Sequence, residues 1–443
     1  IMRSRPILHP PIQVSHLYYR LTRILVWGGI TRYFSISGVD DFEGLPAPGT
    51  PAIFIGNHQN GLMDPMPFSG FVPQQIHWLT RADVFWNPVA RHILWGYNQM
   101  PVYRQRDRVD QLRERNDVIF DACVDRMHAG AAMGIFPEGN HNPFPSLRAL
   151  KGGLAEMLAR AARRHPELKS IQLVPIGLDY EHYLDWRRRF RVRAGQAIPF
   201  ADLLNEDGTI DKPALNARVR EAFRRIMVDL QPEDAQPHLH PALRAHRTTE
   251  MSQEVWKPFT AKLAAWEKRW TEDENWSQRV KDTHAQWQEA WTEAGSPGRP
   301  EAWGTSTEGI RKSKPWAAWL HPLAMLANLP TYPAQWFVTR YVDKAVKNVE
   351  FVPTMRLGMG IVLFPLWWFL LSIVAGLIAP AGWGWLTAGV VWFWGQAGSR
   401  FLAWSITQKH DRADALDGKA FWHDSGLAKV RDAWTTYLKA VNN

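Results

Sequence analysis

A histidine and an aspartate lie close together in residues 55–65, just after a short apolar run. His58 and Asp64 stand on either side of a turn that contains Gly61. Histidine is the side chain best suited to accept a proton near neutral pH, and a carboxylate on its other ring nitrogen fixes the tautomer and stabilises the imidazolium. Because Pro65 favours an extended backbone at Asp64 and can begin a helix, we expect a hydrogen bond from His58 to Asp64 across the turn. The alternative is a turn histidine beside a helix-capping aspartate.

Four further segments carry groups that could bind an anion or that lie where a predicted strand ends. Residues 134–139 run from a predicted strand into Pro-Glu-Gly, which leaves backbone N–H groups free beside a carboxylate. Residues 101–108 place several arginines after a short apolar run, as phosphate binding requires. Lys151 opens a predicted helix in residues 150–153, and residues 173–177 end a strand near a proline. Each signal is weak alone, and a solvated charge run explains the arginines equally well.

The elements that must hold these residues alternate along the chain between about residues 50 and 200. Short apolar runs typical of buried strands cover residues 51–56, 75–80, 131–136 and 170–176. Longer amphipathic stretches typical of helices cover residues 87–94, 109–128 and 152–164. This alternation predicts an α/β fold with a largely parallel or mixed sheet flanked by helices. The polar residues that follow the strands then meet at one edge of the sheet, where α/β folds place their sites.

Composition narrows the class of partner. The 443 residues carry a formal net charge of +9, which suits nucleic acid, an anionic lipid surface or a phosphorylated substrate. The 24 tryptophans favour lipid, because indole prefers the membrane interface. No recognised module for nucleic acid accompanies the charge, so nucleic acid is not an expected partner. The single cysteine, Cys123, excludes an intramolecular disulfide and a cysteine-based zinc site, and we expect it to be buried as an apolar residue.

Helical regions flank the α/β domain, which we place at residues 38–235. Residues 1–37 are predicted to form interfacial amphipathic helices, with ordinary packing helices as the alternative. No secretory signal peptide is expected there. Residues 236–345 are predicted to be a Trp-rich helical accessory region, whose aromatic face either packs into a core or docks on a membrane surface. Residues 411–443 are expected to form an amphipathic tail.

Residues 346–410 are predicted to form a transmembrane helical hairpin. Residues 357–379 contain no charge, and as a helix they would be about 35 Å long, enough to cross a bilayer. Residues 383–398 are again uncharged, after a Pro/Gly apex. Basic residues flank both ends, so both ends and the α/β domain are expected on the cytoplasmic face of a two-span membrane protein. The alternative is a buried helical hairpin in a soluble core.

Four ordered blocks in this sequence carry a resemblance to a known family. The blocks are Asn57-His58 with Asp64, the segment around Arg104, Phe136-Pro-Glu-Gly139 and Val174-Pro-Ile176. In order and spacing they resemble the glycerolipid acyltransferases, the family of glycerol-3-phosphate and 1-acylglycerol-3-phosphate (lysophosphatidic acid) acyltransferases, over about residues 38–235. Five residues separate the histidine from the aspartate where the common pattern has four, which resembles the branch related to glycerol-3-phosphate/dihydroxyacetone-phosphate acyltransferases. Asn140-His141 also stand where many members have Thr-Arg, so His141 either replaces a cationic contact or is structural.

The resemblance implies a fold, a reaction and a set of site residues. His58, oriented by Asp64, would remove the proton from the acceptor hydroxyl, which then attacks the thioester of acyl-CoA directly. The implied acceptor is glycerol phosphate or lysophosphatidic acid, in the synthesis of phosphatidic acid and phospholipid at a lipid bilayer. No metal is expected, and no cofactor other than the co-substrate acyl-CoA. The implied substrate-binding residues are Asn57, Arg104, Glu138, Gly139 and Lys151.

Two alternatives to this function stay open. The first is a phospholipid-remodelling or acyl-carrier-protein-dependent acyltransferase, which takes its acyl chain from another donor. The second is a catalytically silent lipid-binding membrane protein, which the longer loop and the altered block after Gly139 would fit.

Overall fold

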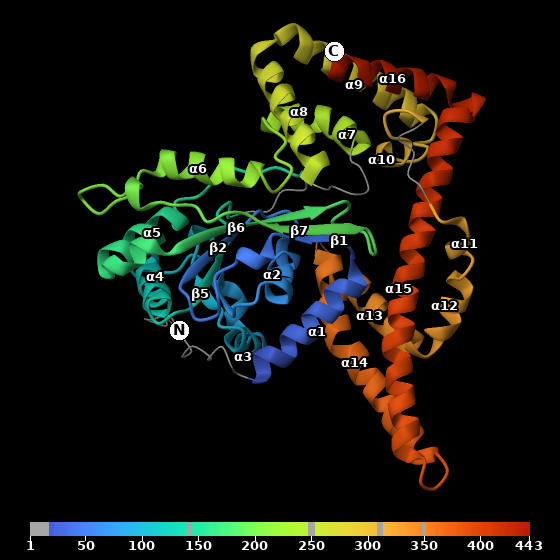
Figure 1. The fold of residues 1–443 in the computed structure, drawn as a ribbon, viewed down its shortest axis with the longest axis horizontal. Helices are drawn as coiled ribbons and strands as arrows, with labels where there is room; N and C mark the ends of the chain where they lie inside the picture. The colour runs from blue at the N-terminus through green and yellow to red at the C-terminus, as the bar shows by residue number, and fades with distance from the viewer. Residues whose placement is uncertain (1–16, 140–143, 247–252, 308–312, 348–350) are drawn as a thin grey trace.

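A mixed seven-stranded sheet forms the centre of the structure, a computed structural model that describes residues 17–139, 144–246, 253–307, 313–347 and 351–443 (Figure 1). The strand order is β1-β7-β6-β2-β5-β3-β4. The last five of these strands are parallel, whereas β1 and β7 run in the opposite direction. The strands are β1 (Ser35–Asp40), β2 (Ala52–Gly56), β3 (Ile76–Arg81), β4 (Met100–Val102), β5 (Ala132–Ile135), β6 (Gln172–Tyr180) and β7 (Arg189–Ala194).

The predicted α/β alternation is confirmed for the elements that surround the site. The four predicted strands are β2, β3, β5 and β6. The three predicted helices are α3 (Pro88–Gly96), α4 (Leu112–His128) and α5 (Gly153–Arg164). β1, β4 and β7 were not predicted, and β6 continues four residues beyond the predicted end at Ile176, to Tyr180.

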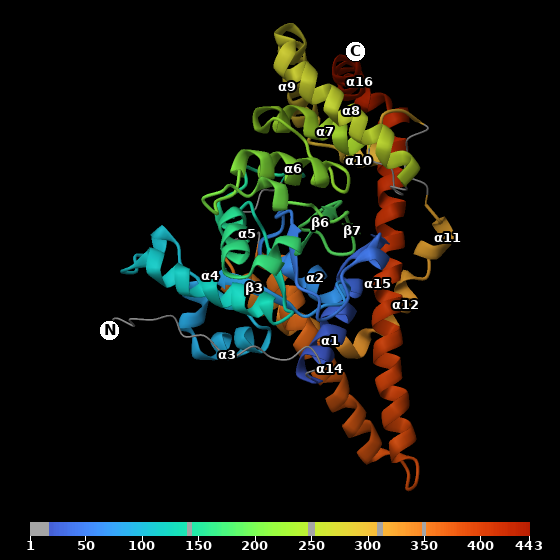
Figure 2. The same ribbon diagram turned by 60° about the vertical axis from the view of Figure 1, so that its left-hand side comes forward.

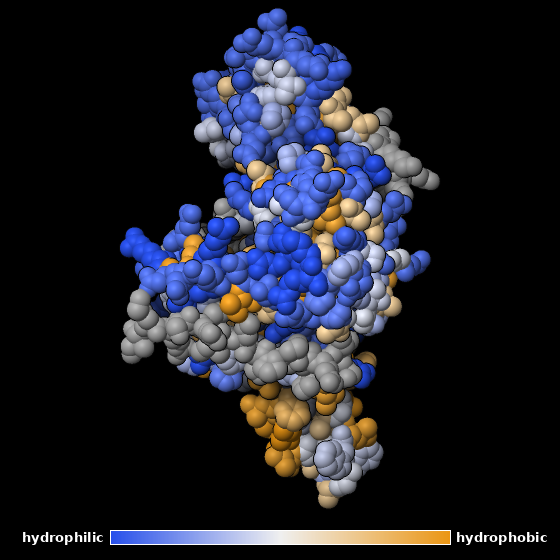
Figure 3. Space-filling model, turned by 90° about the vertical axis from the view of Figure 1, so that its left-hand side faces the viewer, coloured by the Kyte–Doolittle hydropathy of each residue, from blue (hydrophilic) through white to orange (hydrophobic). Residues whose placement is uncertain are grey.

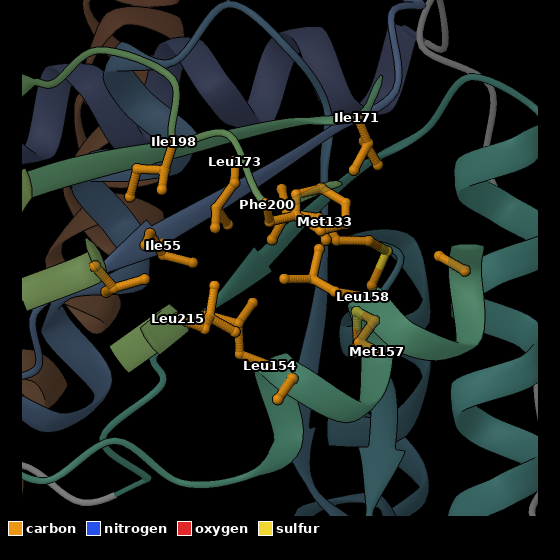
Figure 4. Packing of buried hydrophobic residues seen from close by; sticks show 14 of the residues in the cluster. Ile55, Met133, Leu154, Met157, Leu158, Ile171, Leu173, Ile198, Phe200 and Leu215 are labelled. Atoms are coloured by element: carbon orange, nitrogen blue, oxygen red, sulfur yellow. The ribbon is translucent and has the colours of Figure 1, made fainter. Parts of the chain in front are cut away.

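Both faces of the sheet are covered, because the buried strands are apolar on both sides. In β2, Ile53 and Ile55 point to one core and Ala52 and Phe54 to the other, as the twofold repeat of a strand requires. The first core packs against α4, α5 and α6 (Lys212–Arg224), and Figure 4 shows Ile55, Met133 and Leu173 of three neighbouring strands meeting Leu154 and Leu158 of α5. The second core packs against α1 (Leu17–Tyr33), α2 (Pro65–Phe71) and the start of α14 (Val352–Ile378).

A separate aromatic core holds the accessory helices together. It lies among α7 (Gln236–His246), α8 (Gln253–Glu272), α9 (Glu274–Glu293), α10 (Pro300–Trp303) and α16 (Ala428–Asn442). Its buried tryptophans are Trp266, Trp270, Trp276, Trp287, Trp303 and Trp434. Of the two alternatives for the Trp-rich face, packing into a core is therefore the one that these residues adopt.

One long helix, α15 (Gly384–His423), runs from α14 past the sheet to the accessory core (Figure 1). Near its middle, Asp411 and Asp414 form ion pairs of 2.9 Å and 2.7 Å with Arg189 and Arg188 next to or within β7. At its end, Phe421 stacks on Trp303 of the accessory core. The remaining helices, α11 (Pro315–Ala318), α12 (His321–Ala327) and α13 (Tyr332–Ala345), lie along α15 and α14.

The predicted two-span hairpin is not confirmed. Among the described residues, only α14 is a helix long and apolar enough to cross a membrane, and 11% of its most apolar stretch is buried. Helix α15 turns back along α14, but its uncharged first part ends at Ser399, before Arg400, and is about 24 Å long, less than a bilayer core. Figure 2 shows this pair projecting away from the accessory helices, and Figure 3 shows hydrophobic residues gathered at the projecting end, opposite the mostly hydrophilic accessory helices.

Candidate active site

The candidate site lies where the parallel strands β2, β3, β4 and β5 end. His58 follows β2 after one residue, and Asp64 directly precedes α2. The predicted hydrogen bond is present, with Nδ1 of His58 at 2.8 Å from Oδ2 of Asp64. Asp64 occupies the cap position of α2, yet its carboxylate makes no capping hydrogen bond there. Asp64 therefore binds His58 and does not cap the helix with its side chain.

The carboxylate of Asp64 is fully buried and held from three directions. Oδ2 accepts hydrogen bonds from Nδ1 of His58 and from the backbone N–H of Asn60, and Oδ1 accepts one from the hydroxyl of Tyr180 at 2.7 Å. Burial raises the pKa of Tyr180 well above its ordinary value, so this hydroxyl keeps its proton and acts as a donor. With the Nδ1 proton held by Asp64, the lone pair of the neutral imidazole is on Nε2, which is the atom that can accept a proton.

An aromatic floor fixes the plane of the His58 ring. The ring stacks on Phe136, with centroids 4.5 Å apart, and Phe136 stacks in turn on Trp78 of β3. Gly56 permits this arrangement, because a Cβ there would lie 2.7 Å from Phe68 and 2.8 Å from Phe136. The last residue of β2 is therefore small because two rings pass over it, and the imidazole has little freedom to tilt.

Glu138 ties the loops after β2 and β5 together. Its Oε1 accepts a hydrogen bond of 2.7 Å from the backbone N–H of His58, and its Oε2 accepts one of 3.0 Å from the N–H of Arg148. The side chain is buried, which raises its pKa to about 7, although the two backbone donors act in the opposite direction. Both oxygens are thus used to position the backbone beside His58. Direct contact with substrate, which the sequence analysis predicted for Glu138, stays a prediction.

Gly139 and Lys151 form one corner of the site. Gly139 has φ of +69°, in the left-handed region, and the backbone N–H of Lys151 donates a hydrogen bond of 2.8 Å to the carbonyl of Pro137. A Cβ at position 139 would lie 3.1 Å from Cγ of Lys151. The Lys151 side chain therefore runs past Gly139 and is exposed. The two predicted anion-binding residues are brought together as expected.

Arg104 lies further along the same edge, after β4. Its guanidinium binds Asp107 at 2.8 Å and approaches Asp83, which follows β3, at 3.4 Å. The hydrogen bond from Arg104 lowers the pKa of Asp107, so this carboxylate stays ionised. β5 and β3 separate β4 from β2, which places the two strands about 14 Å apart. Arg104 is thus on the candidate edge but not next to His58, and its role in phosphate binding stays a prediction.

Asn57 is buried and binds the neighbouring strand. Its amide donates to the carbonyl of Leu178 and accepts from the N–H of the same residue, at 2.9 Å and 2.7 Å. This pair extends the β2–β6 ladder by one residue and carries His58 into place. Substrate contact by Asn57 stays a prediction, and His141 lies outside the described residues.

Two side chains that contact the His58–Asp64 pair were not expected from the sequence. Phe136 stood inside one of the four blocks but received no role. Tyr180 could have been found, because Ile176, Leu178 and Tyr180 continue the alternation of β6 toward the same face as the site.

Within the part of the chain that the structure describes, one cluster has the chemistry of metal ligands. It consists of His128, His165 and Glu167, at the ends of α4 and α5. These ends precede β5 and β6, so the cluster lies at the opposite edge of the sheet from His58. The His58–Asp64 pair is not part of it.

Comparisons with known proteins place part of the chain among acyltransferases. Residues 39–179 match the model of the Acyltransferase family. The chain is 39% identical over 79 residues to glycerol-3-phosphate O-acyltransferase 2 of Saccharomyces cerevisiae, covering 18% of this chain and 10% of the yeast protein. It is 26% identical over 156 residues to a chloroplastic 1-acyl-sn-glycerol-3-phosphate acyltransferase of Arabidopsis thaliana, covering 34% of this chain and 39% of the plant protein. The resemblance to the glycerolipid acyltransferases is thus confirmed for this part of the chain.

A solved structure also aligns with the chain. The 1-acyl-sn-glycerophosphate acyltransferase of Thermotoga maritima aligns with a TM-score of 0.34 and 15% identity, over 47% of this chain and 78% of that one. The sequence alignments span well under two thirds of the yeast and plant relatives. They therefore do not concern the whole of either relative.

Proposed function

We propose, from the premise that residues 39–179 form an acyltransferase domain of the glycerolipid type, that the chain is a membrane-bound O-acyltransferase. It transfers a fatty acyl group from acyl-CoA to the hydroxyl of glycerol-3-phosphate or 1-acylglycerol-3-phosphate. The observation that carries this proposal is the His58–Asp64 pair, held by Tyr180 and the backbone of Asn60 at the end of β2. Such a pair supplies general-base catalysis, typically worth about 10²- to 10⁴-fold in rate.

The reaction needs one direct displacement. Nε2 of His58 takes the proton from the acceptor hydroxyl while its oxygen attacks the thioester carbonyl. The tetrahedral intermediate collapses, the carbon–sulfur bond breaks, and the imidazolium returns the proton to the departing thiolate of CoA. Asp64 stabilises the imidazolium between these two steps. No acyl-enzyme is required. The single cysteine, Cys123, is fully buried in the core on one face of the sheet, whereas Phe54 belongs to the core on the other face.

The acceptor phosphate is held at the corner of Gly139 and Lys151. Lys151 supplies a cation beside the start of α5, where backbone N–H groups also favour an anion. Glu138 holds the floor of this corner in place. Arg104, about 14 Å along the sheet edge, suits a second phosphate.

Helix α14 and the first part of α15 attach the domain to the membrane as a hairpin, with the catalytic domain on the cytoplasmic face. The exposed apolar surface of α14 supports this arrangement. Its first turn reaches the catalytic loop, because a Cβ on Gly61 would lie 3.3 Å from the ring of Phe351. The site therefore opens close to the membrane surface, where acyl chains and lysophospholipids reside.

An assay of thiol release from palmitoyl-CoA tests this function. Purified protein in detergent is given glycerol-3-phosphate, dihydroxyacetone phosphate or lysophosphatidic acid separately. Release that depends on one acceptor, with the acyl group recovered on it, supports the proposal and names the substrate. If acylation is seen only with acyl carrier protein or a phospholipid as donor, that donor takes the place of acyl-CoA in the proposed reaction. If no donor supports transfer, the result favours a catalytically silent lipid-binding protein.

A further inference from the structure

The short helix α3 carries an apolar surface that no element among the described residues covers. Trp86, the last residue of the 3₁₀ turn before it, is 65% exposed, and Val89 and Ile93 are 69% and 50% exposed. Val89 and Ile93 are four residues apart and so share one face of the helix. Three large apolar side chains are thus exposed side by side. Such a contiguous patch differs from the single exposed apolar residues that are common on soluble proteins.

This surface continues into the exposed face of α1. Gly96 at the end of α3 lies against Tyr18, whose ring would be 2.7 Å from a Cβ at that position, and Tyr18 also contacts Tyr97. Beyond this contact α1 exposes four large aliphatic side chains, Leu17, Leu21, Ile24 and Leu25. Further along α1, Gly29 packs directly against Leu357 and Ile361 of α14. One apolar belt therefore runs from α3 through α1 to the candidate membrane span.

The charges on the two helices of the belt are of one sign, and the acidic residue of the turn before α3, Asp83, is paired with Arg81 and Arg104. Neither α1 nor α3 contains an acidic residue, and they carry Arg20, Arg23, Arg32 and Arg91. Arg91 lies over the ring of Trp95, so its side chain packs against the helix surface. An apolar face with a basic rim is suited to the interface of a bilayer that contains anionic lipid.

The orientation agrees with such a partner. Figure 1 shows α3 and the start of α1 on the side of the α/β domain from which α14 and α15 project, and Figure 2 shows the same arrangement from a second direction. A bilayer crossed by α14 would therefore meet α3 and α1 at its cytoplasmic surface.

We propose that α3, with Trp86, inserts into the cytoplasmic leaflet beside α1 and sets the height of the site above the lipid. The inference rests on the proposed attachment of the chain to a membrane. Its consequence for the reaction concerns Arg104. The turn that ends in Trp86 also contains Asp83, which lies 3.4 Å from Arg104. Insertion of Trp86 thus places this guanidinium at the level of lipid headgroups, where it can meet a phosphate borne by a lipid.

Depth can be measured by fluorescence of a label on a single introduced cysteine. The native Cys123 is fully buried and its pKa is raised to about 12 by that burial, so it does not compete for a maleimide. Ile93→Cys carries the test label, Leu377→Cys on α14 is the membrane control, and Leu416→Cys on α15 is an exposed control at the other end of the molecule. The full chain is reconstituted in vesicles of phosphatidylcholine and phosphatidylglycerol that contain a nitroxide-bearing lipid quencher.

We expect quenching at positions 93 and 377 and none at 416. A label at 93 that is quenched no more than at 416, while 377 is quenched, overturns the insertion of α3 and leaves the span intact. Loss of quenching at both 93 and 377 overturns the insertion together with the membrane attachment. A third outcome is that the label at 93 is already shielded in detergent and that this shielding increases with protein concentration. That result would assign the surface to contact with a second copy of the chain and would also overturn the proposal.

A kinetic test uses the variant Val89→Ser/Ile93→Ser. Because the two changes remove apolar area from the inserted face, we expect the KM for vesicle-borne lysophosphatidic acid to rise about tenfold. The kcat with a soluble short-chain acceptor in detergent should stay unchanged. Equal KM values for the variant and the wild type on vesicles would contradict the proposal even if the protein is an active acyltransferase.

Discussion

Tyr180 donates its phenolic proton to Asp64 across 2.7 Å, from a strand that follows the aspartate by 116 residues in sequence. Both groups are buried, so this hydrogen bond is made in a region from which water is excluded. It completes the set of donors around Asp64 and leaves the other carboxylate oxygen for His58 and Asn60. The orientation of the proposed base thus depends on β6 as well as on its own loop.

Removal of this hydroxyl should therefore slow the reaction without unfolding the site. For Tyr180→Phe we expect kcat to fall about tenfold, the equivalent of about 1.4 kcal/mol, because one donor to a buried carboxylate is lost. The KM for acyl-CoA should not change, since Tyr180 contacts Asp64 and not the substrate. Steady-state kinetics check both values, and Tyr341→Phe, an exposed residue on α13, is the matched control. An unchanged kcat for Tyr180→Phe would show that the hydrogen bond has no part in orienting Asp64.

The raised pKa of Glu138 should make the stability of the fold depend on pH. Its pKa in the folded state is about 7, above the ordinary value of 4.5, because burial disfavours the charged form. The stabilisation from its neutral form is fully present below pH 4.5 and is lost as the pH rises through 7. Relative to Glu138→Gln, the wild type should lose up to about 3 kcal/mol of unfolding free energy across this window. Chemical denaturation at several pH values measures the difference, and parallel curves for the two proteins would contradict the raised pKa.

Gly139 and Gly153 lie on either side of the Lys151 corner and should respond differently to alanine. Gly139 has positive φ, and an added Cβ would crowd Cγ of Lys151. We expect Gly139→Ala to cost about 1–2 kcal/mol and to raise the KM for the phosphate acceptor. Gly153 is in the first turn of α5 with no atom within 4 Å of an added Cβ. Gly153→Ala should leave both stability and KM near the wild-type values, and equal effects of the two changes would argue against the corner as a phosphate site.

The attachment of α15 to the sheet depends on a buried ion pair. Asp414 lies 2.7 Å from Arg188, and both side chains are almost inaccessible. Asp414→Ala leaves the guanidinium buried without its nearest carboxylate, with Asp185 at 3.9 Å, so we expect a loss of about 3 kcal/mol in stability. The exposed pair of Glu293 and Lys429 is the control, since Glu293→Ala should have little effect. Thermal unfolding in detergent compares the two, and similar shifts would contradict the importance of burial.

Local patterns were sufficient to predict most of the elements that hold the site, with β4 as the exception. β2, β3, β5 and β6 are buried on both faces and therefore read as apolar runs, and the helices between them have clear amphipathic repeats. β7 alternates arginine with apolar residues and could have been recognised as a strand, whereas the three residues of β4 are too short for a periodic signal. The pairing of Arg188 and Arg189 with α15 joins positions more than 200 residues apart, which no local pattern encodes.

The chemistry of the site could be predicted only in part. The hydrogen bond between His58 and Asp64 is local and was expected from the turn between them. The uses of Asn57 and Glu138 depend on which backbone atoms the neighbouring strands and loops present, a property of the folded sheet. The predicted boundary at residue 410 falls inside α15, because a helix that is apolar at one end and polar at the other has no internal stop signal.

The most direct measurement is the rate of acyl transfer by His58→Ala and Asp64→Asn in otherwise folded protein. Both variants and the wild type are assayed with acyl-CoA and the acceptor that the wild type uses, after their thermal unfolding has been compared. His128→Ala, at the opposite edge of the sheet, is the control histidine. We expect kcat to fall about 10²- to 10⁴-fold for His58→Ala and to fall strongly for Asp64→Asn, with His128→Ala unaffected. A folded His58→Ala protein that transfers the acyl group at the wild-type rate would contradict the central claim.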